Sequence, residues 1–172
     1  MEASGRIRPR LGDVIDDGMV TWNEFATAER DLAETGRSLL IHGPGIGLAF
    51  LATVRKDGAP RLHPVCPVLS NDRLFVLVTP ISPKRHDLVR DGRYALQTFP
   101  QPRAGSDEFY VAGKALPVDD EATRAAVLSD AKHMADAAET VFELTIDRVM
   151  HTRWEHVLTP QMRSVHQKWR AP

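Results

Sequence analysis

Residues 74–93 of this chain read LFVLVTPISPKRHDLVRDGR, and they combine an apolar segment with a well-marked helix start. The segment 74–79 has no polar alternation, which predicts a strand with both faces buried. Ser82 is a suitable N-cap and Pro83 suits the first helical position. Gly92 is a typical residue just beyond a helix end. The stretch therefore predicts a strand, a tight connection and a short helix.

The first turn of this predicted helix carries positive charge. A helix N-terminus has unpaired N–H groups and a partial positive charge, so acidic side chains are usual there. Lys84 and Arg85 occupy the first turn instead. A capped helix start flanked by two cations is what binding of a phosphate group requires. The alternative is a short connecting helix with solvated charges, and this segment alone does not separate the two.

The composition is that of a globular protein. The chain has 172 residues, of which 42% are apolar and 26% charged, enough for one domain with a core and short for two. We expect a flexible arm over residues 1–18 and a single domain over residues 19–172. The net charge of −1 argues against a nucleic-acid binder that depends on positive charge.

Cysteine usage and hydropathy bear on the compartment. The single cysteine, Cys66, excludes an internal disulfide and permits a reducing compartment. The longest apolar region, residues 39–54, is interrupted by His, Gly and Pro, so it does not predict a membrane span. The first residues lack an apolar signal core. We therefore expect a cytoplasmic protein without a membrane partner.

Further strand signals lie on both sides of the opening stretch. Residues 47–55 and 61–69 flank a Lys-Asp-Gly turn, whose Asp-Gly pair favours a hairpin. Pro64 and Pro67 place the second of these strands at an edge or a bulge. Six antiparallel strands at hairpin spacing predict a mainly β protein, a small six-stranded barrel with peripheral helices. The remaining strands are expected at residues 93–99, 108–118 and 140–149.

Helices are expected before and after the strands. Residues 21–40 begin with the capping-box spacing of Thr21 and a glutamate three residues on. They form one helix or two, with Gly36 as the candidate break. A further helix is expected over residues 121–138, and a short one within the tail 156–172.

Three motifs follow one another in a fixed order along the chain. They are DGAPRLHPV at residues 57–65, the opening stretch at 74–93, and FYVAGKA at residues 109–115. Together they resemble the pyridoxamine 5′-phosphate oxidase-like superfamily of FMN-binding split barrels, over roughly residues 47–118. The resemblance implies a split β-barrel. It also implies a homodimer that holds FMN, or in some branches the deazaflavin coenzyme F-420, at the subunit interface.

The same resemblance implies a set of cofactor-binding residues. Ser82, Lys84 and Arg85 match the positions that bind the cofactor phosphate. Arg61 matches a family arginine at the same site. The other members would lie along or near the isoalloxazine ring. They are His63, Pro64, Val65, Val78, Thr79 and Gln97.

Two further side chains have competing interpretations. His63 shares a strand face with Arg61, so it could donate to a flavin carbonyl or protonate a substrate. The alternative is an edge-strand histidine with a backbone partner. Cys66 points to the opposite face between two prolines, and we expect a small buried hydrophobe rather than a reactive thiol. The histidines have no paired metal-ligand spacing, so no metal site is expected.

These observations favour an oxidoreductase that transfers hydride equivalents between bound FMN and a small organic substrate. One alternative is an F-420-dependent reductase of the same fold. Another is a non-catalytic flavin- or haem-binding or stress protein. Cys66 stands where the oxidase itself has a lysine, and that enzyme's C-terminal substrate clamp has no counterpart. The resemblance therefore does not favour oxidation of pyridoxamine phosphate.

Overall fold

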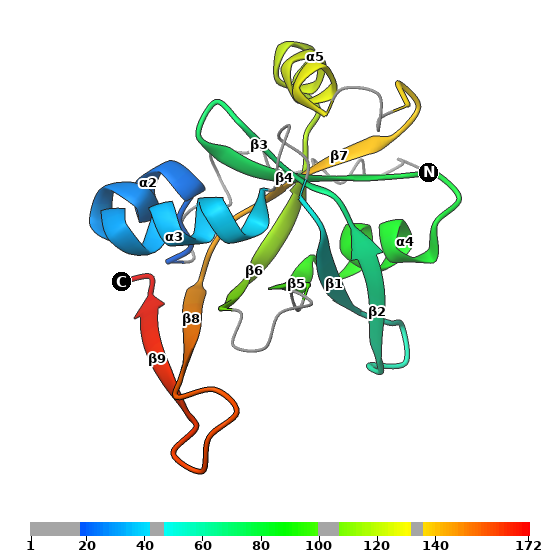
Figure 1. Cartoon of the computed structure of the whole chain (residues 1–172). Helices are drawn as coiled ribbons and strands as arrows, with labels where there is room; N and C mark the ends of the chain where they lie inside the picture. Colours follow the sequence, from blue (N-terminus) through cyan, green and yellow to red (C-terminus); the bar gives the residue numbers. More distant parts are fainter. Residues whose placement is uncertain (1–17, 42–46, 100–106, 132–135) are drawn as a thin grey trace, which may run out of the picture.

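A computed structural model describes residues 18–41, 47–99, 107–131 and 136–172 (Figure 1). The expected arm over residues 1–18 lies outside the described residues except for Gly18. The described residues form a strongly curled antiparallel sheet with helices against its outer edges (Figure 1). The protein is therefore mainly β, as predicted.

The sheet closes on itself because of the order of its strands. That order is β2-β1-β5-β6-β7-β4-β3, with β8 pairing to β6 and to β9. β2 and β3 stand at opposite ends of this order, yet only Cys66 separates them in the chain. The two ends of the sheet must therefore meet, and with β2–β3 counted as one bent strand the curled part has six strands, as predicted. The strands are β1 (Ala49–Val54), β2 (Pro60–Val65), β3 (Pro67–Ser70), β4 (Arg73–Val78), β5 (Arg93–Thr98), β6 (Glu108–Pro117), β7 (Thr140–Leu144), β8 (Arg148–Glu155) and β9 (Arg163–Arg170).

Strand β6 has two partners along one edge. Its first half pairs with β8 and its second half with β7. The change of partner occurs at Gly113, where a Cβ atom would lie 1.9 Å from the carbonyl oxygen of Thr145. The N–H groups of Thr145 and Asp147 donate to the carbonyls on either side of Gly113, at 2.9 and 2.8 Å. The strand predicted at 140–149 is therefore two strands, because the chain bends where it passes this glycine.

The helical segment at residues 21–40 is two helices, α2 (Trp22–Ala28) and α3 (Arg30–Leu40). The capping box at Thr21 is present. The break lies at Glu29, whose backbone angles (φ −137°, ψ 66°) are not helical, so the predicted break at Gly36 is wrong.

Gly36 lies inside α3 for a packing reason. A Cβ atom at this position would lie 2.3 Å from the ring of Phe109, a fully buried residue of β6. The ring also contacts Trp22 of α2, with the two centroids 6.3 Å apart. The glycine therefore allows α3 to lie directly against the barrel, and the aromatic side chains fill the space between them.

Helix α5 (Glu121–Asp130) covers the other end of the barrel beside β3 (Figure 1). It begins at the Asp120 N-cap, whose side chain accepts a hydrogen bond from the N–H of Thr123 at 2.7 Å. The helix ends at Asp130, earlier than predicted, and residues 132–135 lie outside the described residues. Val127 packs with buried residues of the sheet in a second, smaller core.

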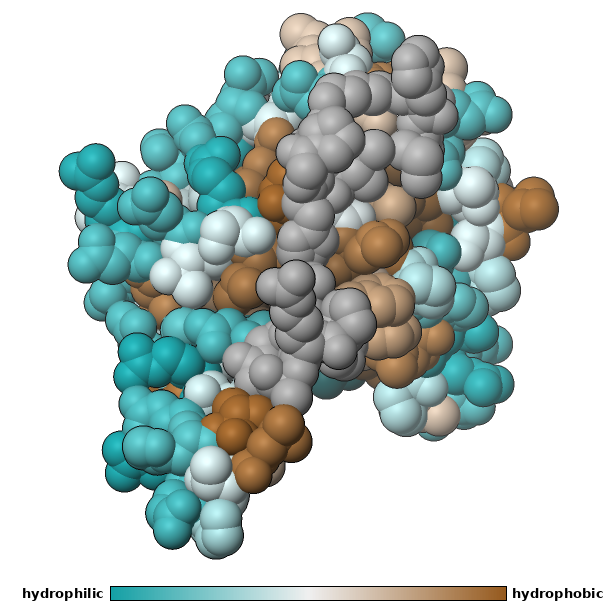
Figure 2. All heavy atoms as spheres, viewed as in Figure 1, coloured by the Kyte–Doolittle hydropathy of each residue, from teal (hydrophilic) through white to brown (hydrophobic). Residues whose placement is uncertain are grey.

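The C-terminal tail is a strand, so the helix expected there is wrong. Strand β9 pairs with the whole length of β8, from Arg148↔Arg170 to Glu155↔Arg163. Trp169 packs on Phe25 of α2 at a centroid distance of 5.0 Å. The hairpin then extends away from the barrel (Figure 1), and Figure 2 shows apolar atoms gathered at its far end. Leu158 there is 86% exposed.

Within the described ranges, no helix is both long and apolar enough to cross a membrane.

Candidate functional site

Helix α4 (Pro83–Arg90) begins as the sequence predicts. Ser82 is the N-cap in an extended conformation, and the helix ends before Gly92, whose φ is +78°. The first turn contains no acidic residue, and the Ser82 side chain makes no capping hydrogen bond. The hydroxyl and the positive helix start are therefore available to a ligand.

Asp87 anchors the inner side of α4, although the sequence analysis did not single it out. It is 4% exposed. Its Oδ2 accepts hydrogen bonds from Arg61 Nε at 2.7 Å and from Thr53 Oγ1 at 3.0 Å, and Arg90 donates to its Oδ1 at 3.4 Å. Burial raises the pKa of Asp87, but the hydrogen bonds from Arg61 and Thr53 outweigh it and hold the pKa below its usual range. A charged carboxylate therefore ties α4 to β1 and β2.

Arg61, His63 and Lys84 lie within electrostatic reach of one another. Arg61 and His63 are two residues apart on β2, so their side chains point to the same face of the sheet. Partial burial and the positive charges of Lys84 and Arg61 lower the pKa of His63, and the charge of Asp87 opposes them. Among the described residues, Lys84 has no carboxylate or hydrogen-bond acceptor for its ammonium group. The structure thus brings three predicted site residues together beside the start of α4.

Arg85 has a different neighbour. Its Nε donates to Thr140 Oγ1 at 2.7 Å, at the start of β7. Thr140 pairs with Val78, the last residue of β4. The guanidinium of Arg85 is therefore held on β7, whereas Arg61 and Lys84 are close to His63. The phosphate contact expected of Arg85 stays a prediction.

The residues expected along the flavin ring are placed on β2 and at the end of β4. Val65 and Val78 are buried, at 7% and 0% exposure, so their side chains belong to the core. Thr79 is exposed immediately after β4. Contact between the backbone at these positions and a ring stays a prediction.

Gln97 lies on the outer face of the barrel. In register, Phe50 of β1 faces both Pro64 of β2 and Gln97 of β5. The next residue, Leu51, is fully buried and faces His63. Because neighbouring residues of a strand point to opposite faces, Gln97 and His63 project from opposite faces of the sheet.

Cys66 lies at the bend between β2 and β3 and is partly buried. Burial, followed by the negative charge of Glu139, raises the pKa of this thiol. The neutral thiol is favoured over a reactive thiolate, although Cys66 is only partly buried and not the fully buried hydrophobe that the sequence predicts. The part of the chain that the structure describes contains no group of three metal-ligating side chains.

The sequence analysis missed the carboxylate at the centre of this region, but a signal for it was present. The Asp-Gly turn fixes the register of the β1–β2 hairpin, in which Thr53 faces Arg61. A hydroxyl and a guanidinium on adjacent strands can share one acceptor, and Asp87 is the acidic residue on the helix that follows β4. What the sequence could not supply is the packing of α4 against this face.

Comparison with known families decides the classification. The pyridoxamine 5′-phosphate oxidase family matches residues 44–153, more than half of the chain. The chain belongs to the pyridoxamine 5′-phosphate oxidase family. The match covers all of β1–β7 and most of β8, and thus includes the whole barrel and α4.

Solved structures with the fold of this family are similar to the chain at low identity. A haem-binding protein from Mycobacterium smegmatis is similar with a TM-score of 0.52 and 21% identity. The match covers 70% of this chain but only 53%, about half, of that protein's length. A haem storage protein from Vibrio cholerae has a TM-score of 0.53 and 16% identity, covering 69% of this chain and 89% of that one. A NimC/NimA family protein from Clostridium acetobutylicum has a TM-score of 0.56 and 11% identity, covering 85% and 96%. No curated protein sequence matches the chain.

Proposed function

We propose that this protein is an FMN-binding oxidoreductase that transfers hydride equivalents between bound flavin and a small organic substrate. The observation that carries the proposal is the position of Lys84. Its ammonium group lies at a helix start without an acidic residue and close to His63, with no acceptor among the described residues. An anionic group bound there would relieve the repulsion among Lys84, Arg61 and the positive helix start.

The chemistry of the surrounding groups fits a phosphate. Lys84 offers a point charge, Ser82 an unused hydroxyl, and the first turn of α4 its free N–H groups. Arg61 is bound to Asp87 through Nε alone among the described residues, so its two terminal amino groups remain as donors. Family membership supports flavin mononucleotide as the molecule that bears this phosphate.

The protein's own groups would bind and orient the cofactor. The flavin supplies the hydride chemistry when it is bound, and the protein supplies position and electrostatics. His63 is held neutral near pH 7 because its pKa is lowered, so it can accept or donate one hydrogen bond beside the phosphate end. Thr79, exposed at the end of β4, is a further polar residue near the start of α4, since the N–H of Ser82 donates to its carbonyl oxygen.

We also propose that the protein is a homodimer. The outer face of β2, β1 and β5 carries apolar side chains that no described segment covers, and Leu62 is 62% exposed. On the same face Phe50 and Phe99 stack at a centroid distance of 4.0 Å. Gln97 lies in this row, facing away from His63, so it would reach a flavin only in a second copy. Light scattering of the flavin-loaded protein checks this, and a monomer would contradict it.

A second candidate is haem binding, favoured by two similar structures that are named for it. His63 supports this candidate because a neutral, half-exposed imidazole can ligate iron. The candidates differ at the helix start, since a phosphate dianion requires Lys84 whereas a histidine–iron bond does not.

The visible spectrum of the purified protein, with mass analysis of what it releases on denaturation, separates the candidates. FMN is expected. Release of F-420 would keep the reaction class and change the coenzyme. A haem spectrum would overturn the flavin proposal, as would failure of the ligand-free protein to bind added FMN.

A further inference from the structure

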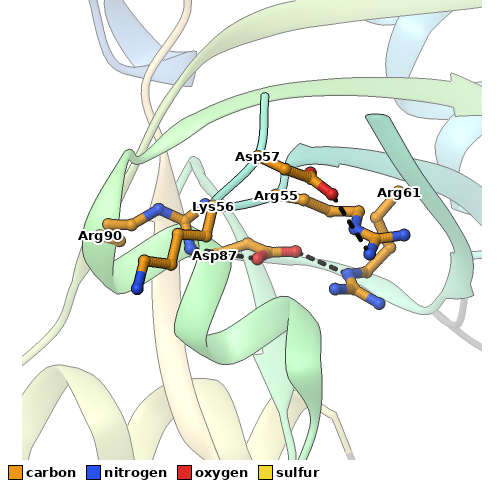
Figure 3. A pocket seen from close by; sticks show the side chains of 6 residues that line it. All are labelled: Arg55, Lys56, Asp57, Arg61, Asp87 and Arg90. Atoms are coloured by element: carbon orange, nitrogen blue, oxygen red, sulfur yellow. Dashed lines mark hydrogen bonds and ion pairs between the residues drawn. The ribbon is translucent and has the colours of Figure 1, made fainter. Parts of the chain in front are cut away.

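A cavity of about 450 Å³ lies between the β1–β2 turn and the middle and end of α4. All six residues that line it are charged, and no apolar side chain contributes (Figure 3). The turn supplies Arg55, Lys56 and Asp57, strand β2 supplies Arg61, and α4 supplies Asp87 and Arg90. The charged groups of this lining favour a small, strongly polar ligand over an apolar one.

The charges of the cavity do not balance. Four cations face two carboxylates, which leaves an excess of two positive charges. Asp57 lies 3.5 Å from Arg55, and Asp87 is shared between Arg61 and Arg90. Figure 3 shows Asp87 between Arg61 on one side and Arg90 and Lys56 on the other. Lys56 has no carboxylate partner among the described residues, so a ligand with two negative charges would neutralise the site.

The cations are positioned by the fold rather than by one another. Arg90 donates to the carbonyl oxygen of Val54 as well as to Asp87, which fixes its guanidinium at the mouth of the turn. The Nε of Arg61 is held by the buried Asp87, which turns the rest of that guanidinium toward other acceptors. Gly58, with φ +84°, and the Asp57 side chain, which accepts from the Ala59 N–H, shape the turn itself. Arg61 and Arg90 are therefore held at the cavity before any ligand arrives.

We propose that this cavity is a second anion site, which binds a phosphate-type dianion beside the proposed flavin site and shares only Arg61 with it. Guanidinium groups bind tetrahedral oxyanions through paired hydrogen bonds, and the lysine adds a point charge. The ligand class is a small phosphorylated compound or free phosphate. The site differs from the proposed flavin site because neither Lys84 nor Ser82 lines the cavity. A failure of the flavin proposal leaves it unaffected.

The test is a titration of the ligand-free full chain with inorganic phosphate, followed by backbone amide NMR at constant ionic strength set with chloride. The signals of residues 56–58 are expected to shift and to saturate. The double variant R55A/K56A is expected to weaken this binding at least tenfold, since two charge-assisted contacts are lost. Both residues are exposed, and Arg55 makes its hydrogen bonds in the turn through its backbone, so the fold is expected to be retained.

Three controls identify the site and the ligand. Arg30→Ala removes one exposed cation from α3 and is expected to leave the titration unchanged. Lys84→Ala, which removes the proposed flavin contact, should also leave the shifts of residues 56–58 in place. Glucose 6-phosphate in place of phosphate distinguishes a phosphorylated compound, which should bind at least as tightly, from free phosphate alone. The proposal is overturned if residues 56–58 do not respond, if the double variant binds as the wild type does, or if Lys84→Ala abolishes their response.

Discussion

Two buried carboxylates in this protein each pair with an arginine, but the two arginines differ in how many donors they keep for a ligand. Glu143 and Asp87 are both buried, at 2% and 4% side-chain exposure, and each meets an arginine that is about one-quarter exposed. Glu143 receives Nε and a terminal amino group of Arg73, in a paired arrangement, and that guanidinium also lies over the ring of Phe75 at 5.3 Å. Asp87 accepts a hydrogen bond from Nε of Arg61 but not from its terminal amino groups, and it also accepts hydrogen bonds from Thr53 and Arg90.

The difference separates a structural pair from one that leaves donors for a ligand. The Arg73–Glu143 pair joins β4 to β7 and directs the arginine's bonds inward. The Asp87 cluster holds α4 on the barrel, while the unused amino groups of Arg61 face a cavity of excess positive charge. Removing a carboxylate should therefore cost stability at both places, but it should change ligand binding at only one.

The largest effect is expected for Glu143→Gln. The change leaves the arginine without its paired acceptor, and breaking a buried pair on one side costs about 3 kcal/mol. Urea denaturation should show this loss in the free energy of unfolding, with FMN affinity per folded molecule unchanged. Asp72→Asn, which breaks the exposed pair with Arg37, is the control and should cost less than about 0.5 kcal/mol. A loss at Glu143 no larger than that of the control would contradict the structural assignment.

Lys84→Ala should change binding rather than stability. Losing one charge-assisted contact to a phosphate costs about 1.5–3 kcal/mol, or roughly a ten- to hundredfold weaker FMN complex. Fluorescence titration measures the affinity, and thermal unfolding of the ligand-free protein should be unchanged. Riboflavin, which lacks the phosphate, should bind wild type and variant alike. Equal FMN affinity in the two proteins would remove Lys84 from the site.

Asp87→Asn should change both properties. The cost in stability is about 1–2 kcal/mol, less than at Glu143, because the amide still accepts from Thr53 and solvent partly compensates the arginines. Removing one negative charge also raises the excess positive charge of the cavity, so inorganic phosphate should bind there several-fold more tightly. Urea denaturation and the phosphate titration give the two readouts. Weaker phosphate binding in a folded variant would show that Asp87 positions the arginines more than it opposes the anion.

The smallest effect is a dependence of FMN affinity on pH. Burial and the charges of Lys84 and Arg61 lower the pKa of His63 in the ligand-free protein. A phosphate dianion nearby would raise this pKa again, so binding takes up protons and FMN affinity should rise a few-fold between pH 8 and pH 6.5. The ligand-free protein should lose some stability as pH falls below about 6.5, since the unfolded chain then binds more protons at this histidine. His63→Gln should flatten both dependences, and an unchanged slope would exclude His63 as their source.

Much of the barrel follows from local sequence, because its strands are apolar segments between turns with marked residues. The Asp-Gly turn, Ser82 and Gly92 predicted the hairpin and the limits of α4. Strand β9 escaped prediction because seven of its eight residues are exposed, so no apolar period marks it. Its hydrogen bonds to β8 make it a strand, and the local sequence of β9 does not predict that pairing.

The proposed cofactor site was only partly predictable for a similar reason. Lys84 and His63 were predicted from motifs, since each motif places a residue on its own element. The partner of Arg85 on β7 and the carboxylate that holds Arg61 depend on how distant elements pack. Asp87 is the one acidic residue within α4, but nothing local shows that its side chain is buried rather than solvated.

The sole sulfhydryl of the chain lies where the two ends of the curled sheet are joined, between β2 and β3. Its partial burial and raised pKa make it slow to alkylate while that junction is shut. Iodoacetamide should therefore modify this thiol more slowly in the folded protein than in the unfolded chain. This native thiol thus allows the junction between β2 and β3 to be probed chemically without an introduced cysteine.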